Sequence, residues 1–233
     1  MEGLFRFSLY RIILPFVIGG ALVELLFRIY YHNFYFPSFY ILSLLNGNLI
    51  YIAVFLFWVL GIIFMYSSEV ILFYIFDFNT FNYGNYIERI SPLEKRKLYF
   101  TNFSSVRNEI LEFSEINYVI SVFLISIHML LLSYCFGFWS SKFAILPILI
   151  LILLEIVMLL YYVYILKRKC LNKLINLIKI IYPMVSTIIP FIGVMVYLKH
   201  QNLLIFIFSF LQFLSFILAI RFRIFANKLL YYR

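Results

Sequence analysis

The fold class of this chain is decided by residues 203–220, which read LLIFIFSFLQFLSFILAI. The run carries no charged residue, and about 20 consecutive apolar residues are enough for one helix to cross the hydrocarbon core of a membrane. The whole chain has a similar bias, since its 233 residues are 65% hydrophobic and only 12% charged. A soluble domain of this size would have too little polar surface to cover itself. The sequence therefore predicts an all-α, polytopic transmembrane helical bundle.

Six apolar runs are expected to span the membrane within a single transmembrane domain, residues 1–233. Their approximate bounds are 12–31, 48–66, 118–138, 143–166, 180–198 and 203–220. The one long connection expected between spans covers residues 67–117.

Positive charge predicts how the bundle is oriented. With six spans, sixteen of the nineteen Lys and Arg residues fall on one side of the membrane, and the exceptions are Arg28, Lys142 and Lys199. Cytoplasmic loops of membrane proteins carry an excess of Lys and Arg. Both termini and the 67–117 connection are therefore expected in the cytoplasm.

The net charge of +9 is accounted for by this orientation signal, so no nucleic-acid partner is expected. Cys135 and Cys170 are far apart in the chain and have neither a disulfide framework nor a metal-binding spacing. No nucleophile–base pair or metal-ligand group is evident. Catalytic, cofactor and metal residues are therefore not predicted in this chain, and the sequence leaves open whether it belongs to an enzyme complex.

Charge is concentrated in the stretch 90–100, ISPLEKRKLYF. Ser91, Pro92 and Glu94 predict the start of a capped helix, in which Ser would cap, Pro would take the first position and Glu would reach back from the third. One interpretation is a solvated basic loop that only sets topology. The sharper one is a short cytoplasmic helix that docks a partner, because topology would require the positive charges but not the cap.

The same stretch resembles the coupling-helix region of ABC exporter permeases of the second class. The residues that carry the resemblance are Ser91, Pro92, Leu93, Glu94, Lys95, Arg96, Lys97, Leu98, Tyr99 and Phe100. The resemblance implies six spans with cytoplasmic termini and a separate cytoplasmic ATPase subunit that binds ATP and docks on this helix. It also implies that two such permeases line a path at their interface. The chain itself has no phosphate-binding P-loop motif.

Two further polar features lie within the predicted spans. Glu24 and Arg28 are four residues apart and are expected to pair on one helix face, although Arg28 could also extend to the membrane surface. Glu155 falls near the middle of the fourth span, where a charged group costs several kcal/mol by insertion scales, about 2.5 to 3.5. It is either a neutral carboxyl bonded to a neighbouring helix or a substrate or proton site.

The sequence does not favour haem binding. Haem ligation would need two axial ligands at one depth, and His128 near the middle of the third span has no such partner, since His32 and His200 lie at span ends. The alternative to a permease is a non-catalytic structural subunit of a larger membrane complex, such as a respiratory assembly. Either protein would contact lipids, form a homodimer or hetero-oligomer, and reside in a prokaryotic cell membrane or an organellar inner membrane.

Overall fold

A computed structural model describes residues 2–34, 39–45, 47, 50–72, 104–162, 168–200 and 202–231 of the chain. Within these ranges the protein is helical and contains no strand. The helices are α1 (Glu2–Tyr30), α2 (Ile41–Leu45), α3 (Ile50–Leu72), α7 (Ser104–Trp139), the 3₁₀ turn η2 (Ser141–Ile145), α8 (Leu146–Tyr162), α9 (Arg168–His200) and α10 (Leu203–Tyr231). The predicted all-α class is confirmed for the described residues.

Five of the described helices contain a segment long and apolar enough to cross a membrane. These segments are Ile12–Tyr30, Ile50–Leu72, Phe113–Trp139, Asn176–Lys199 and Leu203–Ala226. The fourth predicted span corresponds to η2 followed by α8. The 17 residues of α8 cover about 26 Å at the helical rise of about 1.5 Å per residue, slightly less than a hydrocarbon core. The chain is therefore an integral membrane protein with at least five candidate spans.

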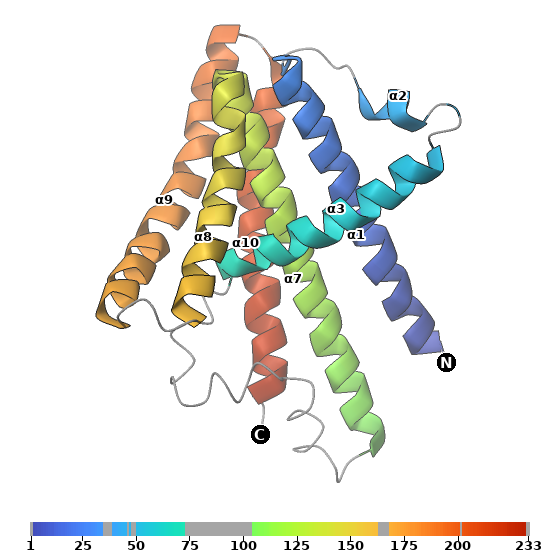
Figure 1. The fold of residues 1–233 in the computed structure, drawn as a ribbon. Helices are drawn as coiled ribbons and strands as arrows, with labels where there is room; N and C mark the ends of the chain where they lie inside the picture. The colour runs from blue at the N-terminus through green and yellow to red at the C-terminus, as the bar shows by residue number, and fades with distance from the viewer. Residues whose placement is uncertain are drawn as a thin grey trace.

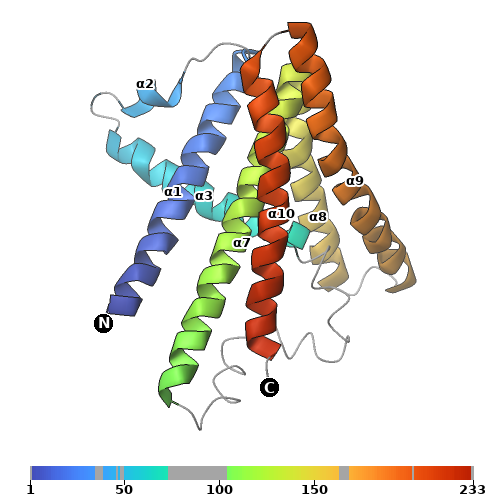
Figure 2. The same ribbon diagram turned by 180° about the vertical axis from the view of Figure 1, so that it is seen from behind.

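The helices are arranged around α7. In Figures 1 and 2, α1, α7, α8, α9 and α10 run roughly along one axis, whereas α3 crosses α1 and α7 obliquely. The most extensive packing joins α7 to α10 and α1 to α3, and α9 packs against α10. Both ends of the chain lie at one end of the bundle (Figure 1), called the termini end below. The opposite end, where α1 stops and short turns join α7 to α8 and α9 to α10, is called the turn end.

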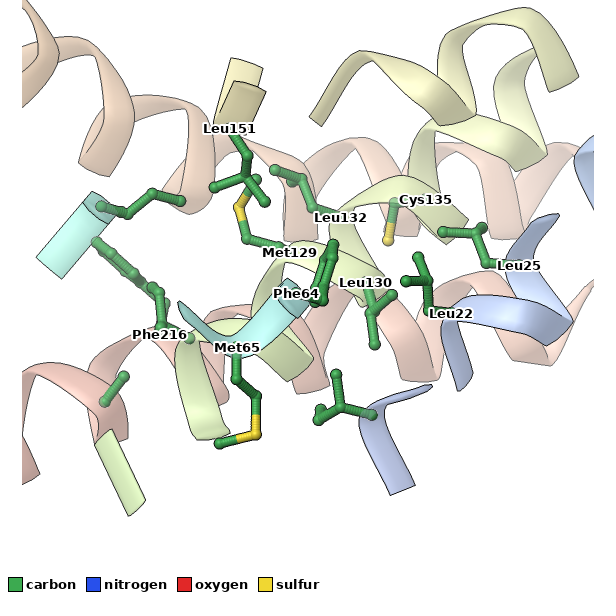
Figure 3. Packing of buried hydrophobic residues seen from close by; sticks show 14 of the residues in the cluster. Leu22, Leu25, Phe64, Met65, Met129, Leu130, Leu132, Cys135, Leu151 and Phe216 are labelled. Atoms are coloured by element: carbon green, nitrogen blue, oxygen red, sulfur yellow. The ribbon is translucent and has the colours of Figure 1, made fainter. Parts of the chain in front are cut away.

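A continuous apolar core surrounds α7. Figure 3 shows Leu22 and Leu25 of α1, Phe64 and Met65 of α3, Leu151 of α8 and Phe216 of α10 around the α7 side chains Met129, Leu130, Leu132 and Cys135. All of these side chains are buried. Because lipid tails are as apolar as leucine, such a core holds a membrane protein together mainly through close packing and not through exclusion of water.

Two glycines let α1 and α3 cross with their backbones in contact. A Cβ atom added to Gly19 would overlap the backbone carbonyl of Phe57, and one added to Gly61 would overlap the carbonyl of Pro15. Small residues at helix crossings are a common way for membrane helices to approach closely. At this crossing, the absence of a side chain on each helix is therefore required by the fold.

The connection predicted at 67–117 is shorter in the structure, because helix occupies both of its ends. The second helix continues through Ser67–Leu72, with Ile71 and Leu72 completely buried. The burial of its last residues against the bundle explains why this segment stays helical. The next helix begins at Ser104, fourteen residues before the predicted start of the third span.

Two later helices also exceed their predicted spans. The helix of the fifth span starts at Arg168 and not near residue 180. Its added turns carry apolar residues at Leu171, Leu174 and Ile178, a helical spacing that favours an amphipathic segment. The helix of the sixth span continues to Tyr231, because Arg223 within the extension is buried and ion-paired. The sequence rules had placed both basic segments in cytoplasmic loops.

The outer surface of the bundle suits a lipid environment. Large apolar side chains are exposed along α3, α8 and α9, and examples are Phe55, Leu153, Phe191 and Met195. In water, exposed apolar surface this extensive would cause aggregation. It is the surface expected where lipid tails are the surrounding medium.

Candidate functional site

The predicted pair of Glu24 and Arg28 is present near the turn end of the bundle. The Arg28 Nε atom donates to Glu24 Oε1 at 3.0 Å, and both side chains are 8% exposed. The second carboxylate oxygen of Glu24 accepts the backbone N–H of Ile41 at 2.9 Å, so the carboxylate also fixes the start of α2. The Arg28 guanidinium lies 5.8 Å from the centre of the Tyr134 ring. Arg28 is therefore held inside the protein and does not extend to the membrane surface.

An aromatic residue fixes the same region to α7. Phe34 follows α1 and is 2% exposed. Its ring covers Gly137, where any Cβ atom would overlap the ring, and it meets Tyr134 and Phe138 edge to face. Glu24, Arg28 and Phe34 thus act together to attach the segment between α1 and α3 to the centre of the bundle.

A second polar cluster joins α7, α9 and α10 inside the bundle. The Gln212 Nε2 atom of α10 donates to the backbone carbonyl of Ser186 in α9 at 2.9 Å. His128 of α7 makes a 2.8 Å hydrogen bond through Nδ1 to the backbone carbonyl of Gln212. A carbonyl oxygen can only accept, so Nδ1 must carry the proton. All three side chains are completely buried.

The bond from Gln212 has a specific backbone cause. Pro190 lies inside α9 and has no N–H, so the carbonyl of Ser186, four residues earlier, has no donor within its own helix. Membrane proteins tolerate such prolines where a neighbouring helix satisfies the freed carbonyl. Gln212 is placed to do this from α10. Sequence reasoning missed this residue, although the Ser186–Pro190 spacing together with an amide in an apolar span was a usable signal.

Aromatic and sulfur-containing side chains enclose this cluster. The His128 ring lies 5.0 Å from Phe216 and 5.6 Å from Tyr182, centre to centre. The Tyr182 hydroxyl donates to the Met129 sulfur at 2.9 Å. His128 is therefore surrounded by protein on its faces and hydrogen-bonded at one nitrogen, while His32 bonds through Nδ1 to Ser141 at the turn end. The structure thus does not bring these two histidines together.

A third polar cluster lies toward the termini end, where α3, α7 and α10 meet. An Arg223 Nη atom is 3.7 Å from a Glu69 carboxylate oxygen, and the two side chains are 7% and 25% exposed. The guanidinium also lies 4.3 Å from the centre of the Tyr118 ring, a cation–π distance. Ser114 adds a hydrogen bond to the Ala226 carbonyl at 3.1 Å. Sequence reasoning missed this cluster because Glu69 and Arg223 were both placed outside the spans.

Glu155 lies on α8 and is only partly buried. Its neighbours Leu153 and Ile156 are exposed apolar residues. No hydrogen bond or ion pair joins its carboxyl to another of the described residues. The structure therefore does not unite Glu155 with the Glu24–Arg28 pair or with His128, and it does not supply the partner from a neighbouring helix that a bonded carboxyl would have.

The predicted docking residues, Ser91 to Phe100, lie outside the described residues, between α3 and α7. The described part of the chain contains no group of three or more His, Cys, Asp or Glu side chains able to hold a metal ion. The polar side chains of the clusters described above link helices to one another. What these clusters can do chemically is satisfy buried backbone and charged groups within the membrane.

Comparison with known proteins finds no relative of this chain. The chain matches no protein-family model, no curated protein and no solved structure.

Proposed function

We propose that the chain is the membrane-spanning permease subunit of an ATP-driven exporter. A separate cytoplasmic ATPase would dock on the helix expected at residues 91–100 and move the bundle as it binds and hydrolyses ATP. The observation that carries the proposal is the Ser91-Pro92 start with its basic run, which resembles a coupling helix. Its place between two long membrane helices, α3 and α7, is where such a helix would act on the bundle.

The arrangement of the bundle supports this function in two further ways. Both chain ends lie at the same end of the bundle (Figure 1), as a permease with cytoplasmic termini requires. The α7–α10 pair is linked to the end of α3 through Arg223 and Glu69. Because α3 immediately precedes the connection that contains the docking segment in the chain, a displacement of that connection would be carried to the centre of the bundle through this ion pair.

A specific observation also favours the second candidate, a structural subunit of a larger membrane complex. The intramembrane charges of Glu24, Arg28, Glu69 and Arg223 are engaged in pairs within the described chain. A scaffold needs such pairs, whereas a transport path needs polar groups that can reach a substrate. In this case the segment 91–100 would dock a neighbouring subunit in place of an ATPase.

One experiment separates the two functions. The double variant Leu93→Asp and Leu98→Asp places charge at two apolar positions of the docking helix without altering its basic residues. The control is Asn82→Asp with Asn85→Asp, which adds the same charge to the same connection outside the motif. We expect a P-loop ATPase to co-purify with the wild type and with the control, and to be lost from the Leu93/Leu98 variant, because an apolar docking face tolerates buried charge poorly.

Retention of the ATPase by the Leu93/Leu98 variant at the wild-type level would contradict the docking role. Co-purification of other membrane subunits without any ATPase would support the structural role instead. Normal membrane insertion of both variants, measured by their amount in the membrane fraction, is required for the comparison.

A further inference from the structure

Two buried polar atoms lie at the α7–α10 contact without a hydrogen-bond partner among the described residues. They are Nε2 of His128 and Oε1 of Gln212, and both side chains have no exposed surface. They belong to neighbouring groups, since the other ring nitrogen of His128 bonds to the backbone of Gln212 at 2.8 Å. A buried polar atom with no partner costs about 1 to 3 kcal/mol.

The chemistry of both atoms is fixed by the bonds on the other side of each group. Nδ1 of His128 carries the proton, because it faces a carbonyl, so Nε2 of the neutral ring is a bare acceptor. The Gln212 amide nitrogen donates to the Ser186 carbonyl at 2.9 Å. A flipped amide would bring two acceptors together, so Oε1 must be the atom left over. Both orphan atoms therefore accept hydrogen bonds and cannot satisfy each other.

The hydroxyl groups of Tyr182 and Ser186 are already used as donors. The Tyr182 hydroxyl donates to the Met129 sulfur at 2.9 Å. The Ser186 hydroxyl donates to the Tyr182 carbonyl at 3.0 Å within its own helix. Because none of the described residues donates to the two acceptors, a ligand from outside the chain would supply the hydrogen-bond donors.

The ligand must be small and rich in donors, because both acceptor atoms are buried and the rings of Tyr182 and Phe216 lie against His128. A cation would supply donors but would bring a charge into the membrane interior at a cost of several kcal/mol, about 2.5 to 3.5 on insertion scales. Water is neutral, donates two hydrogen bonds and commonly occupies buried positions next to unsatisfied polar groups.

We propose that a buried water molecule is bound between α7 and α10, where it donates hydrogen bonds to Nε2 of His128 and Oε1 of Gln212. This site does not depend on the proposed function. It makes the α7–α9–α10 contact a continuous polar connection, from the Ser186 carbonyl through Gln212 and the water to His128. The bundle would then contain a hydrated point inside an otherwise apolar contact.

The test is nitrogen magnetic resonance of the full chain in lipid bilayers, with ¹⁵N-labelled histidine. The substitutions His32→Gln and His200→Gln leave His128 as the only histidine. We expect a neutral ring that is protonated at Nδ1 and carries no proton at Nε2. We also expect magnetisation transfer from water protons to Nε2.

A further substitution, Gln212→Leu, removes one of the two acceptors. The water transfer to Nε2 should then fall at least about twofold, because the water loses one of its anchors. The control Ser209→Ala on the same helix removes a hydroxyl that bonds within α10, to the Phe206 carbonyl, and should leave the transfer unchanged.

Three results would overturn the proposal. A ring protonated at both nitrogens would mean that a proton, and not water, satisfies Nε2. A ring protonated only at Nε2 would mean that the acceptor does not exist. A ring protonated only at Nδ1 with no transfer from water would mean that the site is dry. The measurement on the His128-only protein is decisive even where the Gln212→Leu variant fails to fold.

Discussion

The two most extensive helix contacts of the bundle are made in opposite ways. The α1–α3 contact depends on missing side chains, since Gly19 and Gly61 let the backbones touch. The α7–α10 contact depends on polar side chains, through the Gln212–His128 cluster at its centre and the packing of Arg223 on the Tyr118 ring toward the termini end. In a membrane both strategies are available, because helix association relies on close packing and on interhelical hydrogen bonds.

This difference predicts how each contact fails. A contact between backbones is lost when a single methyl group is added, because the backbone cannot move aside without separating the helices. A contact between polar side chains is lost in smaller steps, because each hydrogen bond can be removed separately. We therefore expect large effects from small substitutions at the α1–α3 crossing and graded effects at the α7–α10 contact.

The largest effect is predicted for Gly19→Ala. The new Cβ atom would overlap the Phe57 carbonyl, so the free energy of unfolding should fall by about 3 kcal/mol, the upper part of the range for overpacking. The matched control is Gly20→Ala, whose Cβ atom would meet side chains and no backbone, the end of Ile41 at 3.0 Å and the Phe57 ring at 4.0 Å. Thermal unfolding in mixed micelles measures both. Equal stability of the two variants would contradict the backbone contact.

A smaller loss is predicted for Arg223→Met. Breaking a fully buried ion pair by removing one partner costs about 3 to 5 kcal/mol. Because the Glu69 side chain is 25% exposed, we expect about 2 kcal/mol. Adding Glu69→Gln should recover part of this loss, since no unpaired carboxylate remains. The control Arg221→Met removes the same charge from an exposed position on α10 and should cost little. An equal loss from Arg221→Met would contradict the predicted role of the pair.

The two ion pairs also show what the sequence could predict. Glu24 and Arg28 are four residues apart on one helix, so local spacing was enough to predict their contact. Glu69 and Arg223 belong to different helices, and their contact depends on how α3 crosses the bundle. Each had also been placed beyond a predicted span end, because polar residues at the end of an apolar run were taken to mark the membrane boundary. Burial of a charge by a partner far along the chain cannot be read from hydropathy.

The helix ends were also predicted wrongly because packing against distant parts of the chain cannot be read from hydropathy. Apolar runs located the membrane segments correctly in α1, α3, α7, α9 and α10. The helices continue beyond these runs wherever a polar turn can pack on the bundle or lie at its surface, as at Ser67–Leu72 and in the first turns of α9. The Gln212–Ser186 bond was predictable in part, because Pro190 shows which carbonyl needs a donor. Which helix supplies that donor is decided only by packing.

The central claim is that Gln212 stabilises the bundle by satisfying the Ser186 carbonyl that Pro190 leaves free. A double-mutant cycle tests it most directly. In the wild type, Gln212→Leu should lower the free energy of unfolding by about 1.5 kcal/mol, the cost of leaving a buried acceptor unsatisfied. In the Pro190→Ala background, residue 190 regains an N–H for the Ser186 carbonyl, so the same substitution should cost about 1 kcal/mol less.

The control for this cycle is Pro183→Ala, which restores a donor to the carbonyl of Lys179 and not to that of Ser186. Both backgrounds are measured by unfolding in mixed micelles. The account predicts strong coupling between positions 190 and 212 and additive effects between positions 183 and 212. An equal cost of Gln212→Leu in the wild-type and Pro190→Ala backgrounds would contradict it.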